Sequence, residues 1–270
     1  MNFVMLFSER YVAVAKMSFL RFAAYKADIV IHFFTYPVAF IAFFFFVTGA
    51  FSQGLGQTGY TVPQLLTYYS VAWMLRMINH HGADISIGQS ILSGNIAGLL
   101  VKPIDHHHYR AAEVGGKIFG RIIFYSFPAL ILLLFFVKRF LFAWDMDFAR
   151  FIVLAIVGCL INFEIQYIIG CTAFFITVNH QVVWVTDMVI RLISGLIIPL
   201  SLFPSVLKTL LALLPFQSIY YLPIQAWIGK LDAPGFNIAL ATGLVWLAIL
   251  YLFGKWVCSM GLRRFTIYGG

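Results

Sequence analysis

Long apolar runs, bounded but rarely interrupted by charged residues, dominate the sequence. Hydrophobic residues occupy 62% of the 270 positions and charged residues only 10%, whereas a soluble domain carries roughly 25% charged residues. These runs are too continuous for half-buried strands, and the alternation typical of a membrane β-barrel is absent. Because only helices and closed barrels satisfy their backbone hydrogen bonds in lipid, we expect an all-α integral membrane protein.

The apolar runs predict six transmembrane helices, an even number that places both chain ends on one side of the membrane. The predicted spans are residues 29–51, 63–81, 118–137, 151–178, 181–203 and 236–258. The side with both ends carries 12 Lys and Arg residues and the opposite side 5, so the positive-inside rule predicts cytoplasmic termini. No removable signal peptide is evident, and we expect the first span to serve as the insertion signal.

Three further segments do not fit a straight membrane crossing. In residues 1–28, charged and apolar side chains fall mostly on opposite faces of a helical wheel, which predicts an N-terminal interfacial helix. Its predicted apolar face consists of Tyr11, Val12, Ala15, Phe19 and Phe22. Residues 82–117 form the longest polar interruption, and their spaced apolar positions predict a short cytoplasmic amphipathic helix between the second and third spans. Residues 199–230 contain four prolines, which predict a re-entrant helical hairpin before the sixth span. We expect residues 1–270 to form a single transmembrane domain.

The basic residues that give the chain a formal charge of +8 bracket the apolar spans. That placement is typical of a topology signal and of contact with lipid headgroups, and it argues against a groove for nucleic acid. The three cysteines, Cys159, Cys171 and Cys258, lie within apolar segments and have no CxxC spacing. We interpret them as small core residues without a redox role.

One polar stretch stands out, in which Asp105 precedes the consecutive histidines His106, His107 and His108. Consecutive side chains on a helix point about 100° apart, so three neighbouring histidines are not expected to converge on one ion, and we predict no metal site. We expect Asp105, the histidines and Arg110 to lie at the cytoplasmic headgroup level. There the imidazoles would hydrogen-bond to lipid, water or a partner.

Three ionisable residues lie inside predicted spans: Glu164 in the fourth, and Asp187 and Arg191 in the fifth. Ionisable groups at membrane depth are costly and face a partner or a cavity. Asp187 and Arg191 are four residues apart with the acid first, the favourable order for a pair on one helix. Two interpretations stay open: a structural clamp between the fourth and fifth spans, or groups that line a translocation path.

The order of these elements and three short motifs carry a resemblance to a known family. The motifs are the stretch SGNIAGLLVKP that begins at Ser93, the LPF segment at Leu214 with the later Pro223, and the terminal GLRR that begins at Gly261. Together they resemble the ABC-2 type permease family, and more narrowly a branch with chains of this length once catalogued as a domain of unknown function. The resemblance covers nearly the whole chain.

The resemblance implies a permease subunit of an ATP-binding-cassette exporter in the bacterial plasma (inner) membrane. Its partners would be two ATPase subunits, which bind ATP and Mg, and a second permease chain, either a sister chain or a second copy, among membrane lipids. The helix after the second span would couple to the ATPase, through Ile85, Ile91, Leu92, Gly94, Ile96, Leu99, Leu100, Lys102 and Pro103. Family members often carry an acidic residue after the Ser-Gly pair, where this chain has Asn95 and Ile96.

The sequence itself holds no nucleotide-binding motif. A P-loop requires G-x-x-x-x-G-K-[ST], and the Gly-Lys pairs of this chain lack both the upstream glycine and the following Ser or Thr. We therefore expect no enzyme activity, catalytic residue or cofactor in this chain, and a hydrophobic or amphiphilic substrate that is moved outward. An intramembrane protease is disfavoured because H-E-x-x-H and G-x-S-G are absent. The main alternative is an ATP-independent channel or secondary carrier, although inverted halves are not evident.

Overall fold

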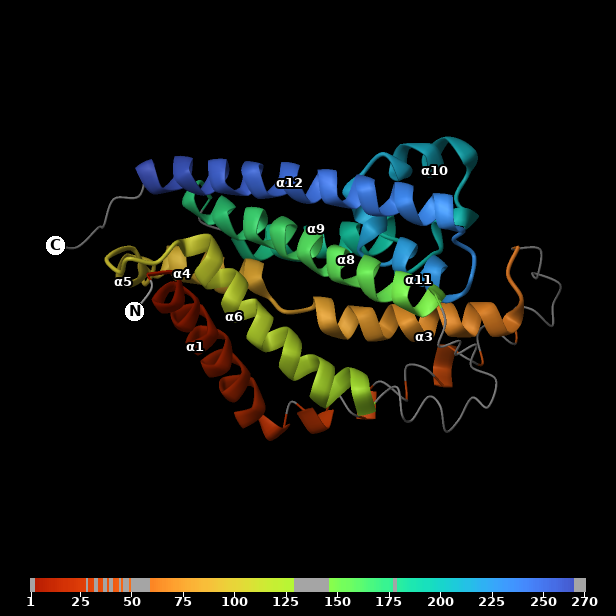
Figure 1. The fold of residues 1–270 in the computed structure, drawn as a ribbon, viewed down its shortest axis with the longest axis horizontal. Helices are drawn as coiled ribbons and strands as arrows, with labels where there is room; N and C mark the ends of the chain where they lie inside the picture. The colour runs from red at the N-terminus through yellow and green to blue at the C-terminus, as the bar shows by residue number, and fades with distance from the viewer. Residues whose placement is uncertain are drawn as a thin grey trace.

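The computed structural model describes residues 3–27, 59–128, 146–176 and 179–264, with scattered positions between 29 and 49. Every regular element in these parts of the chain is helical. The helices are α1 Phe3–Ala24, α3 Val62–Asn79, α4 Ala83–Leu92, α5 Ala97–Leu100, α6 His106–Arg121, α8 Met146–Cys171, α9 Asn179–Ile193, α10 Ser205–Ala212, α11 Tyr221–Trp227 and α12 Ala233–Arg264. They form an elongated bundle in which α12 runs alongside α8 (Figure 1).

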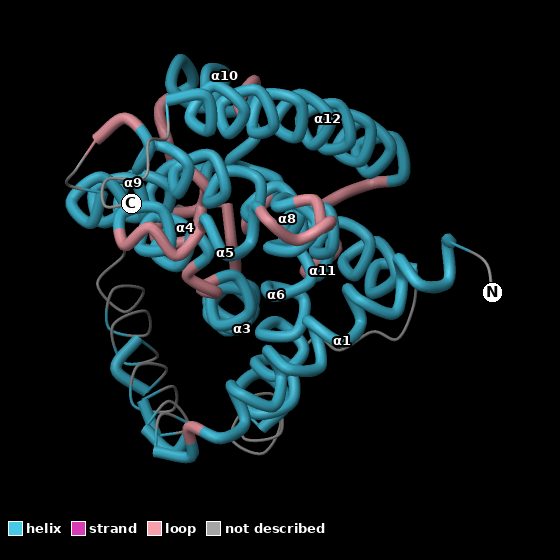
Figure 2. The backbone as a smooth tube through the Cα atoms, turned by 90° about the vertical axis from the view of Figure 1, so that its left-hand side faces the viewer, coloured by secondary structure: helices cyan, strands magenta, loops and turns pink. Residues whose placement is uncertain are grey.

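The centre of the bundle is α8, which packs against α12, α4 and α11. Figure 2 shows it between α12 on one side and α3 and α6 on the other. Glycines allow this close packing, since small residues let helix backbones approach one another. A Cβ atom at Gly158 would lie 2.3 Å from the carbonyl oxygen of Ser218, and one at Gly170 would lie 2.7 Å from the Cβ of Ile87.

Two described helices are long and apolar enough to cross a membrane: Met146–Phe174, which is α8 with a terminal 3-10 turn, and Ala233–Arg264. They correspond to the predicted spans 151–178 and 236–258. A third candidate is a pair of helical segments, Ser205–Ala212 and Pro215–Trp227, bent by 78° at the break between them. The predicted span 29–51 and the second half of 118–137 lie largely outside the described residues, so the count of six spans stays a prediction.

The predicted continuous span 181–203 is wrong in its extent, because α9 already ends at Ile193. Gly195 adopts a φ of 85°, a left-handed conformation that suits glycine and ends the helix. Two tyrosines of α3 hold the turn in place: the hydroxyl of Tyr68 donates to the carbonyl of Gly195 at 2.5 Å, and that of Tyr69 to the carbonyl of Ile197 at 2.8 Å. With 15 residues, α9 is about 22 Å long, shorter than the hydrocarbon core of about 30 Å.

The polar interruption after α3 folds differently from the single amphipathic helix that we expected. It forms α4 and α5, separated by a turn in which Gly94 has a φ of 74°. The next helix, α6, begins at His106, twelve residues before the predicted start of the third span. Asp105 explains this early start because its carboxylate caps α6 by accepting a hydrogen bond from the backbone N–H of His108 at 3.0 Å.

The N-terminal helix expected from the charge pattern is present as α1, and it packs along α6. The contact uses Ala15, Phe19 and Phe22 of its predicted apolar face, and a Cβ at Gly116 of α6 would overlap the backbone of Ala15. Val12, which belongs to the same predicted face, is instead 65% exposed. The position of α1 at the membrane surface stays a prediction.

The proline-rich segment 199–230 forms short helical pieces, as its composition predicts. These are a 3-10 turn at Leu200–Leu202, α10, a second 3-10 turn at Pro215–Ser218 and α11. Pro204 and Pro215 stand at the beginnings of α10 and of the second turn, where the missing N–H costs no helical hydrogen bond. The re-entrant course of this segment through a membrane stays a prediction.

Candidate functional site

The turn between α4 and α6 forms an exposed tip, which we define as residues 92–103. Figure 1 places α5 at the same end of the molecule as the start of α1 and the end of α12. Leu92, Leu100 and Val101 are exposed at this tip, by 49%, 42% and 84%, and Gly94, Lys102 and Pro103 are also exposed. An apolar group of this kind on the surface is typical of a binding site for another protein.

The nine residues that the resemblance implies for ATPase contact therefore divide into buried or half-buried residues and exposed ones. Ile91 and Ile96 are buried, at 5% and 0% exposed, and Ile85 and Leu99 are half-buried. Ile91 and Ile96 share a core cluster with residues of α8 and α12. These isoleucines thus fix the tip to the bundle, whereas the exposed residues are available to a partner.

A second set of contacts joins the start of α4 to α8 through polar side chains. The side-chain amides of Asn162 and Gln166 donate to the backbone carbonyl of Asn79, at 2.9 and 3.2 Å, and the backbone N–H of Ala83 donates to Gln166 at 3.1 Å. All four residues are buried. Sequence reasoning missed them, although an Asn and a Gln four residues apart inside an apolar span are a signal of a polar contact.

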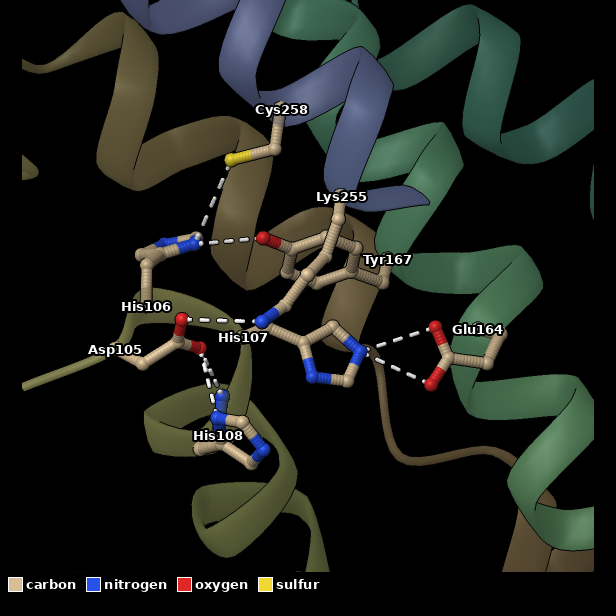
Figure 3. Close-up of polar contacts among 8 residues, drawn as sticks. All are labelled: Asp105, His106, His107, His108, Glu164, Tyr167, Lys255 and Cys258. Atoms are coloured by element: carbon tan, nitrogen blue, oxygen red, sulfur yellow. Dashed lines mark hydrogen bonds and ion pairs between the residues drawn. The ribbon is translucent and has the colours of Figure 1, made fainter. Parts of the chain in front are cut away.

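Directly beside the tip, the three histidines point in three directions (Figure 3). The Nδ1 of His106 lies 3.1 Å from the hydroxyl of Tyr167. The Nε2 of His107 lies 2.9 and 3.0 Å from the two carboxylate oxygens of Glu164. The Nδ1 of His108 lies 2.9 Å from Asp105. His106 and His107 therefore point toward different partners, as predicted, whereas the rings of His107 and His108 stay close, with their centroids 5.6 Å apart.

The expectation that these side chains face lipid, water or a partner is wrong for His107 and Arg110, whereas their level in the membrane stays a prediction. His107 and Arg110 are both only 6% exposed. His107 bonds to Glu164 of α8, and Arg110 donates to Glu113 at 2.9 Å. The sequence could not reveal this, because it depends on the early start of α6 at His106, which places the first turn of the helix against α8.

Glu164 therefore links α8 to α6, and the predicted clamp between the fourth and fifth spans is wrong for this residue. It lies seven residues before the end of the helix at Cys171, a rise of about 10 Å. Glu164 thus lies close to the end of α8 that supports the tip.

The i, i+4 pair of Asp187 and Arg191 forms as predicted, and the structure adds a third member. Arg76 of α3 donates to the same carboxylate oxygen of Asp187 at 3.1 Å, so that the pair joins α9 to α3. The side chains are 27% exposed for Asp187 and 12% for Arg76. A cavity of about 280 Å³ adjoins this group and is lined by polar residues that include Asp84 and His180.

Asp105, His107 and His108 also bring three potential metal ligands together. One ligand atom from each lies within 4.8 Å of the other two. The Nδ1 of His107 is buried and has no hydrogen-bond partner in the described part of the chain, and a carboxylate on the other ring nitrogen is typical of metal-binding histidines. A competing cation is already present, since the Nζ of Lys255 lies 3.3 Å from Asp105. The expectation of no metal site stays a prediction.

Comparison with known proteins gives one family assignment. A family model described as ABC-2 family transporter protein matches residues 25–269. This range contains α3 to α12, and with them both the tip and the polar contacts beneath it. No curated protein gives a significant match to the chain.

Proposed function

We propose that this chain, which belongs to the ABC-2 family of transporter proteins, is the permease subunit of an exporter driven by ATP that a separate subunit hydrolyses. Its family and its apolar helices make it a membrane-embedded helical transport protein. The observation that best supports the proposed mechanism is the form of the tip, whose outer surface is apolar and exposed while its inner residues are fixed on α8.

In this proposal the tip contacts the ATPase. Leu92, Leu100 and Val101 would enter an apolar groove of the ATPase. The ATPase subunits would hold ATP and Mg, and this chain would bind neither. A second permease chain and surrounding lipid would cover the exposed apolar faces of α9 and α12, which include Trp184 and Leu252.

Movement of the tip would reach the bundle by two routes. The first is α4, which packs on α8 through Ile87 and Gly170. The second is the start of α6, where Asp105 pairs with Lys255 of α12 and His107 bonds to Glu164 of α8. Because packed helices move as rigid bodies, a shift of the tip would displace α8 and α12 together.

Asp187 and Arg191 of α9 keep their two interpretations in this account, a structural clamp or part of the substrate path. Asp187 joins α9 to α3, which favours a structural clamp, although between the second and fifth predicted spans rather than between the fourth and fifth. The adjoining polar cavity supports the second interpretation, in which these residues line the path of the substrate. A larger cavity of about 620 Å³ between α3, α6 and α8 has almost purely apolar walls, which supports a hydrophobic or amphiphilic substrate.

The proposal can be tested by purifying the tagged chain from its native bacterial inner membrane. We expect an ABC-type ATPase to co-purify with it, and ATP hydrolysis to accompany the complex but not the isolated chain. Transport by the isolated chain in proteoliposomes, driven by a proton gradient without nucleotide, would contradict the proposal and support a secondary carrier.

A further inference from the structure

A basic pocket of about 750 Å³ lies between α1 and α6. It is bounded by α1, by α6 between Tyr109 and Arg121, and by residues 102–104 of the chain before α6. Its charged lining residues are Arg21, Lys102, Arg110, Lys117, Arg121 and Glu113. Since five of these six are basic, the pocket attracts anions.

The protein compensates only part of this positive charge. Arg110 and Lys117 both pair with Glu113, each at 2.9 Å. Burial alone would raise the pKa of Glu113, but the two cations outweigh it and hold that pKa below its ordinary value, so the carboxylate is ionised. The side chains of Arg21 and Lys102 form no hydrogen bond or ion pair with any other described residue. Two cations of the pocket are therefore available to a ligand.

The remaining walls are suited to a ligand with an apolar part. Val14, Met17 and Ile104 line the pocket beside the basic residues. His81 lines it as well, is only 4% exposed, and its Nδ1 has no hydrogen-bond partner among the described residues. Because a buried ring nitrogen without a partner costs free energy, a ligand hydroxyl group at this nitrogen would be favourable.

We propose that this pocket binds an anionic phospholipid from the cytoplasmic leaflet, with its headgroup among the basic side chains, of which Arg21 and Lys102 are the two unpaired ones within the described residues. The lining of α6 from Tyr109 to Arg121 extends over about 18 Å. That length accommodates a headgroup and the first methylene groups of the acyl chains, whereas a small inorganic anion would leave the apolar walls uncovered. Basic pockets at the cytoplasmic side of membrane helices typically bind such headgroups.

A lipid in this position would connect α1 to the tip. Arg21 belongs to α1, and Lys102 is the one basic residue within residues 92–103. Within the described residues, α1 contacts the bundle chiefly through α6. The lipid would therefore stabilise α1 against the bundle and hold the tip in one orientation.

The experiment uses the full-length chain, delipidated in a neutral detergent. Its melting temperature is measured with added phosphatidylglycerol, phosphatidylcholine or inorganic phosphate, and bound lipid is identified by native mass spectrometry. We expect phosphatidylglycerol alone to raise the melting temperature and to remain bound. Each of the variants Arg21→Gln and Lys102→Gln should weaken its binding about fivefold, the effect of one basic residue beside an anionic headgroup.

Two further variants separate a specific pocket from general attraction to a basic surface. Lys16→Gln on α1 and Lys208→Gln on α10 each remove an exposed cation outside the pocket, and both should leave the binding unchanged. Equal weakening by all four variants would overturn the proposal. So would binding of phosphatidylcholine with equal strength, or equal stabilisation by inorganic phosphate, which would indicate a site for free anions.

Discussion

His107 of α6 and Glu164 of α8 form a buried pair, with Nε2 at 2.9 and 3.0 Å from the two carboxylate oxygens. Both side chains are only 6% exposed. The pair joins the helix that follows the tip to the central helix of the bundle. In the proposed mechanism it is one of the two connections through which the tip moves α8.

Replacement of Glu164 should therefore destabilise the protein. Glu164→Ala leaves the ring of His107 buried without its partner, which costs about 2 kcal/mol. The measurement is thermal unfolding in detergent. His108→Ala is the matched control because its pair with Asp105 is exposed, with side chains 48% and 38% accessible, and such pairs contribute about 0–1 kcal/mol. Equal effects of the two substitutions would contradict this account of the pair.

The close contact between α4 and α8 predicts a second effect. In Gly170→Ala the new methyl group would lie 2.7 Å from the Cβ of Ile87, so the helices must separate, at a cost of about 1–3 kcal/mol. Gly115→Ala is the control, because a Cβ there meets nothing within 4 Å and alanine favours the helix. Equal stability of Gly170→Ala and Gly115→Ala would show that the close approach of Gly170 to Ile87 does not determine the packing of α4 on α8.

The two ion pairs of Asp187, with Arg76 and with Arg191, should differ in their contribution to the free energy of unfolding. Arg76 is 12% exposed and Arg191 37%, so the Arg76 pair is the better shielded from water. We expect Arg76→Met to lower the free energy of unfolding by about 2 kcal/mol and Arg191→Met by less than about 1 kcal/mol. Chemical unfolding of the two variants measures the difference. A larger loss of stability in Arg191→Met than in Arg76→Met would contradict this prediction.

Glu113 predicts a dependence of stability on pH. Burial raises the pKa of Glu113, but Lys117 and Arg110 lower it by more than burial raises it. The folded-state pKa therefore lies below the ordinary value of 4.5. A depressed carboxyl pKa contributes stability that is present above the unfolded-state pKa and is lost as the pH falls through the folded-state pKa. Glu113→Gln should therefore lower the melting temperature at pH 7, and the difference from the wild type should be smaller at about pH 3, because this stability is lost as the pH falls through the folded-state pKa. An equal difference between the two proteins at both pH values would exclude this role.

The sequence predicts the class of this fold well, because the cost of unpaired backbone groups in lipid leaves few choices. The apolar runs correctly indicate helices at α3, α8 and α12, and the prolines of 199–230 correctly indicate short helical pieces. The ends of the elements depend on local contacts that composition does not reveal. The carboxylate cap at Asp105 and the left-handed turn at Gly195 are examples.

The candidate site was only partly predictable, for a similar reason. A helix presents its side chains in all directions, and sequence spacing does not tell which of them meets another helix. The pairing of Asp187 with Arg191 follows from its i, i+4 spacing. The contact of His107 with Glu164 joins residues 57 positions apart, and only the packing of α6 on α8 produces it.

The central claim is that the exposed tip binds the ATPase, and co-purification of the ATPase with tip variants tests it most directly. The test variant carries Leu100→Asp and Val101→Asp. The control is Leu213→Asp, which alters an equally exposed leucine at the end of α10. We predict that the test variant keeps its melting temperature but retains at least tenfold less ATPase than the wild type, whereas the control retains all of it. Undiminished recovery of the ATPase with the test variant would contradict the account.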